Sequence, residues 1–302
     1  KNVLTCDRIK DILVGDALIT PDSGRVVIEK FADMRPLRKA LITTSAVTKY
    51  HSLFNAELKI EGRLKYNGTA DMAYIDENTQ SQIIHFEEIK LDTAHQTIGK
   101  GVIEESQNFH LSPQYAYYGK FSLNSNIKHL LFSGGVRIEH SCDNLEKSFF
   151  KFEAHIDPLD IFIPIDTIMK DVSSRKLGAG MMVKSTSPSK VYPAFLSPKL
   201  SKDDSPLLEA NGFLHYDRNA KKFFIGSKEK IIQPKIPGNL IELNSQSCDV
   251  HADGNIDFHA RIGMVDLINI GKATLKKTDE SLSMQTSGIL HFPFDESAMK
   301  RI

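Results

Sequence analysis

Residues 115–140 decide the fold, and they read YAYYGKFSLNSNIKHLLFSGGVRIEH. Apolar side chains alternate with polar ones, which places Phe121, Leu123, Val136 and Ile138 on one side and Lys120, Ser122, Arg137 and Glu139 on the other. Because successive side chains of a strand point to opposite faces, this period of two predicts half-buried strands. Asn-Ser-Asn at 124–126 tolerates turn geometry, and Gly134-Gly135 favours a second break. The stretch therefore predicts an antiparallel meander of three strands.

A glycine followed by this alternation recurs loosely along the chain, at Gly24, Gly62, Gly119, Gly134, Gly212, Gly254, Gly271 and Gly288. Glycine before a strand suits a bulge or a corner with positive φ. Many short strands with such corners predict an all-β fold of antiparallel meanders, stacked as a sandwich, a jelly roll or an elongated β-structure. The spacing is irregular, so we do not expect a strict solenoid. Helical periodicity is poor, and only residues 2–13 are considered for a short helix.

Composition is that of an ordinary soluble globular protein. The chain has 302 residues, 41% hydrophobic and 25% charged, and can bury a sizeable core. Lys and Arg number 38, as do Asp and Glu, and no dense basic run occurs, so we expect no nucleic-acid partner. No apolar run approaches the roughly 20 residues of a membrane-spanning helix. The chain starts at Lys1 without Met, which leads us to expect a piece of a longer protein.

Residues 170–177 are polar and small, which is typical of a boundary between domains. We therefore predict two β-rich domains, residues 1–170 and 171–302. The alternative is that the same stretch separates two sheets of one continuous elongated β-structure.

The three cysteines are widely spaced at Cys6, Cys142 and Cys248, and no C-x-x-C pair exists. This is neither a disulfide framework nor a zinc site. Thiols that are simply packed are one interpretation. A disulfide between Cys142 and Cys248 is the other, since both lie between Ser and Asp, and it would imply an oxidising compartment.

The chain contains no nucleophile elbow, phosphate-binding loop, dinucleotide fingerprint, H-E-x-x-H helix or EF-hand loop. The densest set of possible metal ligands is His251, Asp253, Asp257 and His259, which would share one face of a strand. Polar alternation is also what a solvated strand face looks like, and this second interpretation is preferred. We assign no catalytic residue, no metal and no cofactor.

A glycosidase would need two carboxylates on either side of a sugar site. The sequence offers Glu87, Glu88, Glu104, Glu105 and Asp157, and it nominates no pair among them. Tyr115, Tyr117 and Tyr118 could stack on a sugar ring, although packing at the start of a strand is the simpler role for Tyr.

Three segments carry a resemblance: LSPQYAYYG (111–119), LFSGGVRI (131–138) and ANGFLHYD (210–217). They resemble segments of very large uncharacterised cell-envelope proteins of Bacteroidota, over most of residues 40–299. More remotely, the Gly-strand pattern is similar to OstA-type β-jelly-roll proteins, which conduct lipopolysaccharide across the periplasm. Neither resemblance brings a functional residue to this chain.

The resemblance implies a non-enzymatic β-rich segment of a periplasmic or cell-surface protein, acting as a scaffold or as a lipid or protein conduit. Its partners would be other envelope proteins, other segments of a longer chain, or lipid. A conduit should keep an apolar groove open, whereas a scaffold should have a closed core and sheet edges available for pairing. The alternatives are a carbohydrate-active or other hydrolytic enzyme, with converging carboxylates or a metal, and a binding subunit of a surface assembly, with a large apolar patch.

Overall fold

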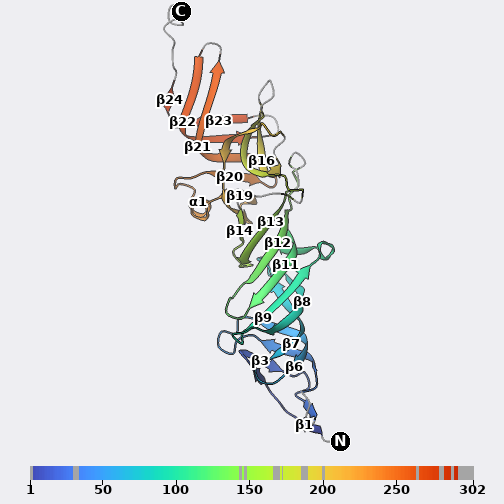
Figure 1. The fold of residues 1–302 in the computed structure, drawn as a ribbon. Helices are drawn as coiled ribbons and strands as arrows, with labels where there is room; N and C mark the ends of the chain where they lie inside the picture. Colours follow the sequence, from blue (N-terminus) through green and yellow to red (C-terminus); the bar gives the residue numbers. More distant parts are fainter. Residues whose placement is uncertain are drawn as a thin grey trace, which may run out of the picture. The chain divides into compact units, whose positions relative to one another are not determined.

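The structure is a computed structural model that describes residues 3–29, 34–142, 145, 148–165, 171, 173–184, 190–198, 201–262, 265–278, 282–286 and 289–291. For residues 256–262, 265–271, 273, 282, 284, 286 and 289–291 only the backbone is described. The chain forms two compact units: residues 1–136 with 152–161, and residues 137–151 with 162–302. The described elements are almost all strands (Figure 1). The all-β, antiparallel prediction is confirmed.

The first unit is built on an antiparallel sheet of eleven strands in the order β13-β12-β11-β9-β8-β7-β6-β5-β3-β2, with β10 beside β11. Its strands are β2 (Ile12–Val14), β3 (Ala17–Thr20), β5 (Leu37–Thr43), β6 (Ser52–Ile60), β7 (Tyr66–Ile75), β8 (Ser81–Leu91), β9 (Thr97–Ile103), β10 (Phe109–Ser112), β11 (Tyr115–Asn124), β12 (Leu130–Ile138) and β13 (Phe149–Ile156). A 3-10 turn, η1 (Glu105–Gln107), precedes β10, and β1 (Val3–Cys6) pairs with β4 (Val26–Glu29). Neighbours in the sheet mostly follow one another in the chain, which is the predicted meander.

One face of this sheet is closed by aromatic side chains. The ring of Tyr117 lies 4.9 Å from that of Phe132 and 5.8 Å from that of Phe152, centroid to centroid. The ring of Tyr74 lies 5.2 Å from that of Phe109. Perpendicular and tilted ring pairs of this kind add to the free energy of burial. The predicted inward residues of β11 and β12, among them Phe121 and Val136, are buried here.

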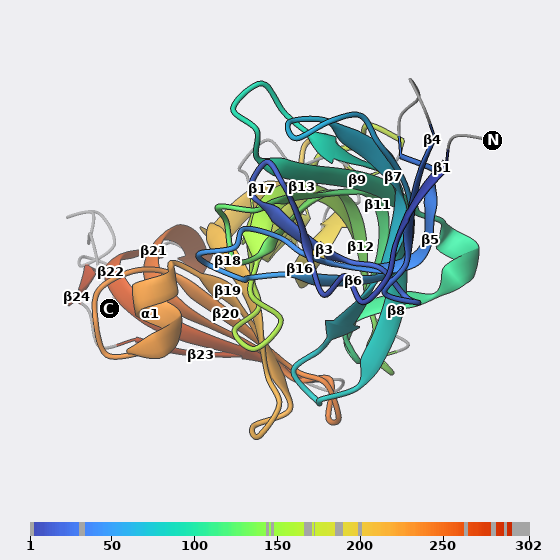
Figure 2. The ribbon, with the colours of Figure 1, turned by 90° about the horizontal axis from the view of Figure 1, so that it is seen from below.

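The sheet curls on itself (Figure 2), and a buried polar network fixes the curl. The carboxylate of Asp16, in the β2–β3 turn, accepts hydrogen bonds from the backbone N–H and the hydroxyl of Thr97, at the start of β9. It also accepts one from the hydroxyl of Ser125, in the β11–β12 turn. The hydroxyl of Tyr66 completes the network by donating to Thr97 Oγ1 at 2.8 Å. Turns that are far apart along the sheet therefore meet at one end of the unit.

Three hairpin turns share one geometry, and each begins at an aspartate: Asp76, Asp92 or Asp171. In each, the Asp Oδ1 atom accepts hydrogen bonds from the N–H groups two and four residues later. The residue three positions after the aspartate has positive φ, as at Thr79 (62°) and His95 (59°). The carboxylate thus satisfies amides that the turn leaves unpaired, which is why Asp is favoured there.

The second unit contains an eight-stranded sheet, in the order β14-β18-β19-β20-β21-β22-β23 with β24 beside β22, and a three-stranded sheet, β16-β15-β17. Its elements are β14 (Phe162–Ile165), β15 (Leu177–Lys184), β16 (Lys190–Pro198), β17 (Ser205–Glu209), β18 (Gly212–Asp217), β19 (Lys222–Gly226), α1 (Lys228–Ile232), β20 (Leu240–Asn244), β21 (Val250–Ile262), β22 (Val265–Lys277), β23 (Leu282–Thr286) and β24 (Ile289–His291). Phe195 of the small sheet packs on Phe223 of the large one, with ring centroids 6.0 Å apart. The two sheets therefore share a core.

Two cross-links fix loops in this unit. Cys142 and Cys248 form a disulfide across 106 positions, with Cα atoms 5.5 Å apart, and Cys6 is free. The ammonium group of Lys230, in α1, is fully buried and donates to the carbonyls of Pro234 and Ile236 and, at 2.8 Å, to the carboxylate of Asp253. Of the two interpretations of these cysteines, packed thiols or a disulfide, the structure has the disulfide between Cys142 and Cys248.

Three expectations differ from the structure. The Gly-Gly break is wrong, because β12 runs through both residues; a Cβ on Gly134 would lie 2.4 Å from the carbonyl oxygen of Tyr118, so glycine is needed for close packing rather than for a turn. A helix at residues 2–13 is wrong for its described part, which contains β1 and the start of β2. The predicted boundary at 170/171 also differs from the division into units, whose limits fall inside β12, inside β13 and between Ile161 and Phe162.

Candidate functional site

The structure describes the side chains of two candidate metal ligands, Asp253 and His251, and not those of the other two. The carboxylate of Asp253 is bound by Lys230 and accepts a longer hydrogen bond, 3.3 Å, from Thr274. His251 lies between Glu242 and Lys276 in the strand register. The side chains of Asp257 and His259 lie outside the described residues. Within the described part of the chain, no three His, Cys, Asp or Glu side chains are placed to hold a metal ion.

The tyrosines proposed as a stacking platform are mostly in the core. Tyr115 and Tyr117 are each 1% exposed, so neither can lie against a sugar ring. Both sit on the same side of β11, as the period of two requires, and that side is the inner one. Tyr118 points to the other face and is half-buried.

The candidate carboxylates are not brought together as a pair. Glu104 caps η1, where the side chain of Gln107 accepts from its backbone N–H. Asp157 caps its own turn by accepting from the N–H of Leu159. Glu87 and Glu88 lie on β8 and line the depressions described next.

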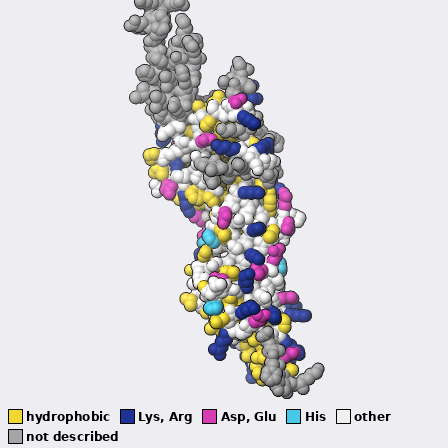
Figure 3. All heavy atoms as spheres, viewed as in Figure 1, with side chains coloured by type: hydrophobic (Ala, Val, Ile, Leu, Met, Phe, Trp, Pro, Cys, Tyr) yellow, Lys and Arg dark blue, Asp and Glu magenta, His cyan; other side chains and the backbone are white. Residues whose placement is uncertain are grey.

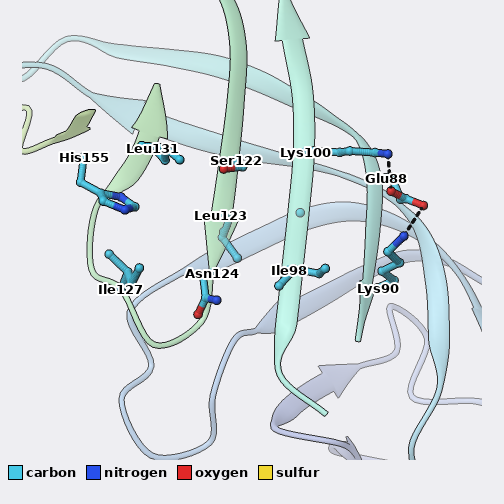
Figure 4. A pocket seen from close by; sticks show the side chains of 11 residues that line it. Glu88, Lys90, Ile98, Lys100, Ser122, Leu123, Asn124, Ile127, Leu131 and His155 are labelled. Atoms are coloured by element: carbon cyan, nitrogen blue, oxygen red, sulfur yellow. Dashed lines mark hydrogen bonds and ion pairs between the residues drawn. The ribbon is translucent and has the colours of Figure 1, made fainter. Parts of the chain in front are cut away.

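Two adjoining depressions lie on the outer face of β8, β9, β11 and β12, opposite the aromatic core. The first encloses about 390 Å³ and is shown in Figure 4. The second encloses about 410 Å³ and shares Lys100, Ser122 and Leu131 with the first. Gly99 and Gly101 line them through their backbone, because a Cβ at either position would point to the inner side, toward Phe86 or Phe121. We treat these two hollows as the candidate site.

Ion pairs set the charge states in the first depression. Glu88 lies between Lys90 (3.0 Å) and Lys100 (2.7 Å) (Figure 4). Hydrogen bonds from Lys100 and Lys90 lower the pKa of the Glu88 carboxyl, and the hydrogen bond to Glu88 raises the pKa of Lys100. At neutral pH Glu88 therefore has no proton to donate, and Lys100 has no lone pair for nucleophilic attack. The arrangement is suited to polar contacts on a surface rather than to proton transfer.

The far side of the first depression is formed by other residue types. His155 and Leu131 project from β13 and β12, and Ile127 from the β11–β12 turn (Figure 4). The His155 Nδ1 atom lies 3.3 Å from the backbone carbonyl of His129. Sequence reasoning missed this surface, because its residues come from five separate strands and a turn. The cross-strand register, in which Glu88 faces Lys100 and Lys100 faces Ser122, is the signal that would have found it.

The described residues thus define an all-β protein of antiparallel sheets, with mixed charges over the visible described surface (Figure 3). No model of a known protein family matches the chain, and no curated protein or solved structure matches it either. Within the described residues, no helix is both long and apolar enough to cross a membrane.

Proposed function

We propose that this chain is a non-enzymatic, β-rich segment of a cell-envelope protein that acts as a structural scaffold. The observation that carries the proposal is the filled interior of the first unit, where Tyr74, Tyr117 and Phe132 pack ring against ring. A scaffold needs a core of this kind, whereas a conduit for acyl chains needs an open apolar groove. The two depressions lie on the opposite face and carry Lys and Glu at their margins, which favours neither acyl chains nor acid–base catalysis.

The disulfide supports the envelope location. Disulfides persist in secreted, periplasmic and surface proteins and are rare in reducing compartments. Cys142 and Cys248 are joined while Cys6 is free, so the pairing is selective. A periplasmic or cell-surface location is therefore part of the proposal.

Native mass spectrometry of protein released gently from its source, combined with lipid extraction, tests the scaffold role. We expect particles that contain other envelope proteins and no stoichiometric lipid. Stoichiometric lipid that survives purification would contradict the scaffold role and support the conduit. A particle without other proteins would also contradict the scaffold role, because a scaffold binds partners.

Thiol trapping in the source cells tests the location. Cells are quenched with acid and the denatured protein is alkylated before and after reduction. We expect one thiol, that of Cys6, to react before reduction and Cys142 and Cys248 to react only after it. Three reactive thiols before reduction would place the chain in a reducing compartment and contradict the proposal.

A further inference from the structure

The turns at one end of the first unit are held together by direct hydrogen bonds. The backbone N–H of Gly15 donates to the carbonyl of Arg63, and that of Ala46 donates to the carbonyl of Asp16. The hydroxyl of Thr48 donates to the carbonyl of Ser125, at 3.3 Å. These contacts bring residues 45–51, 62–65 and 124–128 side by side around the buried Asp16 network. We call the surface formed by these three segments the loop face.

Each segment of the loop face exposes an apolar side chain. Val47 is 89% exposed, Leu64 is 56% exposed, and Tyr50 and Ile127 are 45% and 37% exposed. Single exposed apolar residues are ordinary, but four on three turns held together by hydrogen bonds gather apolar surface at one end of the unit. The turns themselves are well fixed, because His51 is buried beneath them and its Nε2 atom lies 2.8 Å from the carbonyl of Ile127.

The exposed charges on the same segments are all positive. They are Lys49, Arg63, Lys65 and Lys128, and each is next in sequence to an exposed apolar residue. The nearby carboxylate of Glu61 is less exposed and already pairs with Lys59 and Lys65. Lys49, Arg63 and Lys128 form no ion pair within the described part of the chain. This local bias contrasts with the zero net charge of the whole chain.

We propose that the loop face docks on an anionic lipid surface, with Val47, Tyr50, Leu64 and Ile127 entering the interface and the basic residues contacting the headgroups. Exposed apolar side chains flanked by Lys and Arg match the apolar interface and the anionic headgroups of such a surface. Each basic residue near the surface strengthens binding about fivefold. A protein partner would have to supply an acidic rim around an apolar centre, which the lipid interface provides without any specific fit. The docking is peripheral and salt-sensitive, and it does not depend on the scaffold role.

Fluorescence provides a direct test, because the chain contains no Trp. Tyr50→Trp places a single reporter on the loop face, and Ile83→Trp places one on an exposed strand position, 66% exposed, of β8. Vesicles of phosphatidylcholine alone are compared with vesicles of equal parts phosphatidylcholine and phosphatidylglycerol. We expect a blue shift for Tyr50→Trp with the anionic vesicles only, and no shift for Ile83→Trp. No shift at low salt, or the same shift from both reporters, overturns the proposal.

Vesicle flotation with charge-matched variants separates the two parts of the surface. Lys49→Gln/Lys128→Gln should weaken binding to the anionic vesicles about 25-fold, whereas Arg38→Gln/Lys120→Gln, exposed elsewhere in the first unit, should weaken it little. Val47→Asp/Leu64→Asp should abolish binding, and Ile75→Asp/Ile83→Asp should retain it. All of these positions are solvent-exposed, so circular dichroism should show a native fold in each variant. Equal losses in the loop-face variants and their controls, or binding only to an acidic protein, would overturn the lipid proposal and leave the scaffold role intact.

Discussion

Asp16 and Thr97 lie 81 positions apart, and Asp16 Oδ1 accepts hydrogen bonds from the Thr97 backbone N–H at 2.9 Å and from its hydroxyl at 2.6 Å. Four strands of the sheet separate β3 from β9, so the two residues can meet only because the sheet curls. The Asp16 carboxylate is only partly buried, but it is costly to remove because the buried Thr97 and Ser125 lose their hydrogen-bond partner.

Asp16→Ala should therefore lower the free energy of unfolding by about 3 kcal/mol, and Asp16→Asn by less, because one acceptor oxygen remains. Urea unfolding followed by circular dichroism measures both. Asp11→Ala is the control, since the Asp11 carboxylate bonds only at the exposed surface, to Thr20. Equal effects at positions 11 and 16 would show that the Asp16 network does not fix the curl.

Opening the disulfide should destabilise the second unit. In the chain-entropy account, releasing a loop closed across 106 positions lowers stability by about 5 kcal/mol. Cys142→Ser and Cys248→Ser should have equal effects on the unfolding midpoint, and adding a reductant should have no further effect on either. Cys6→Ser is the matched control, because Cys6 is free. A large effect of Cys6→Ser would point to a different pairing.

Asp253→Ala should be more harmful than its partial exposure suggests, because it leaves the fully buried ammonium of Lys230 without a carboxylate. Breaking such a pair costs about 3 kcal/mol, whereas replacing both partners by apolar residues restores much of the loss. Thermal unfolding of Asp253→Ala and of Lys230→Met/Asp253→Leu tests this. The exposed pair of Asp249 and Lys276, 3.7 Å apart, gives the control Asp249→Ala. If the double variant is less stable than Asp253→Ala, the pair stabilises the fold in its own right.

Burial lowers the pKa of His51 below its usual value. The folded state therefore binds this proton less readily than the unfolded state, and stability is complete above about pH 6.5, the unfolded pKa. As the pH falls from there to the folded pKa, His51 reduces stability by at most about 1.4 kcal/mol per pH unit. Unfolding midpoints measured from about pH 7.5 to about pH 5 should fall for the native chain and fall less for His51→Gln. His155→Gln, at an exposed position, should follow the native chain. A slope that His51→Gln does not change would exclude His51 as its origin.

Local patterns predicted what depends on local rules. The alternation around Phe121 and Val136 predicted strands and their buried face, because a period of two is enough for both. The same alternation puts Tyr115 and Tyr117 on the side of Phe121, and they are core residues rather than a platform. The Asp turns had a readable signal, an Asp four residues before Gln or Arg, which was not used.

Contacts between distant residues escaped prediction for a physical reason. The partners of Asp16 lie 81 and 109 positions away, and only the curl of the sheet brings them together. The outer depressions likewise combine residues of five strands and of four strands, whose register no single segment determines. The resemblance to envelope proteins stays a prediction.

The disulfide also limits how far the protein can be stretched. When tension is applied at the two ends of the chain, the path of force crosses from Cys142 directly to Cys248 and bypasses the residues between them. A span of 106 positions would otherwise lengthen to about 370 Å when pulled straight, at about 3.5 Å per residue. The residues between the two cysteines cannot contribute this length while the bond is oxidised. In a scaffold under mechanical load, only the residues outside the disulfide loop could extend.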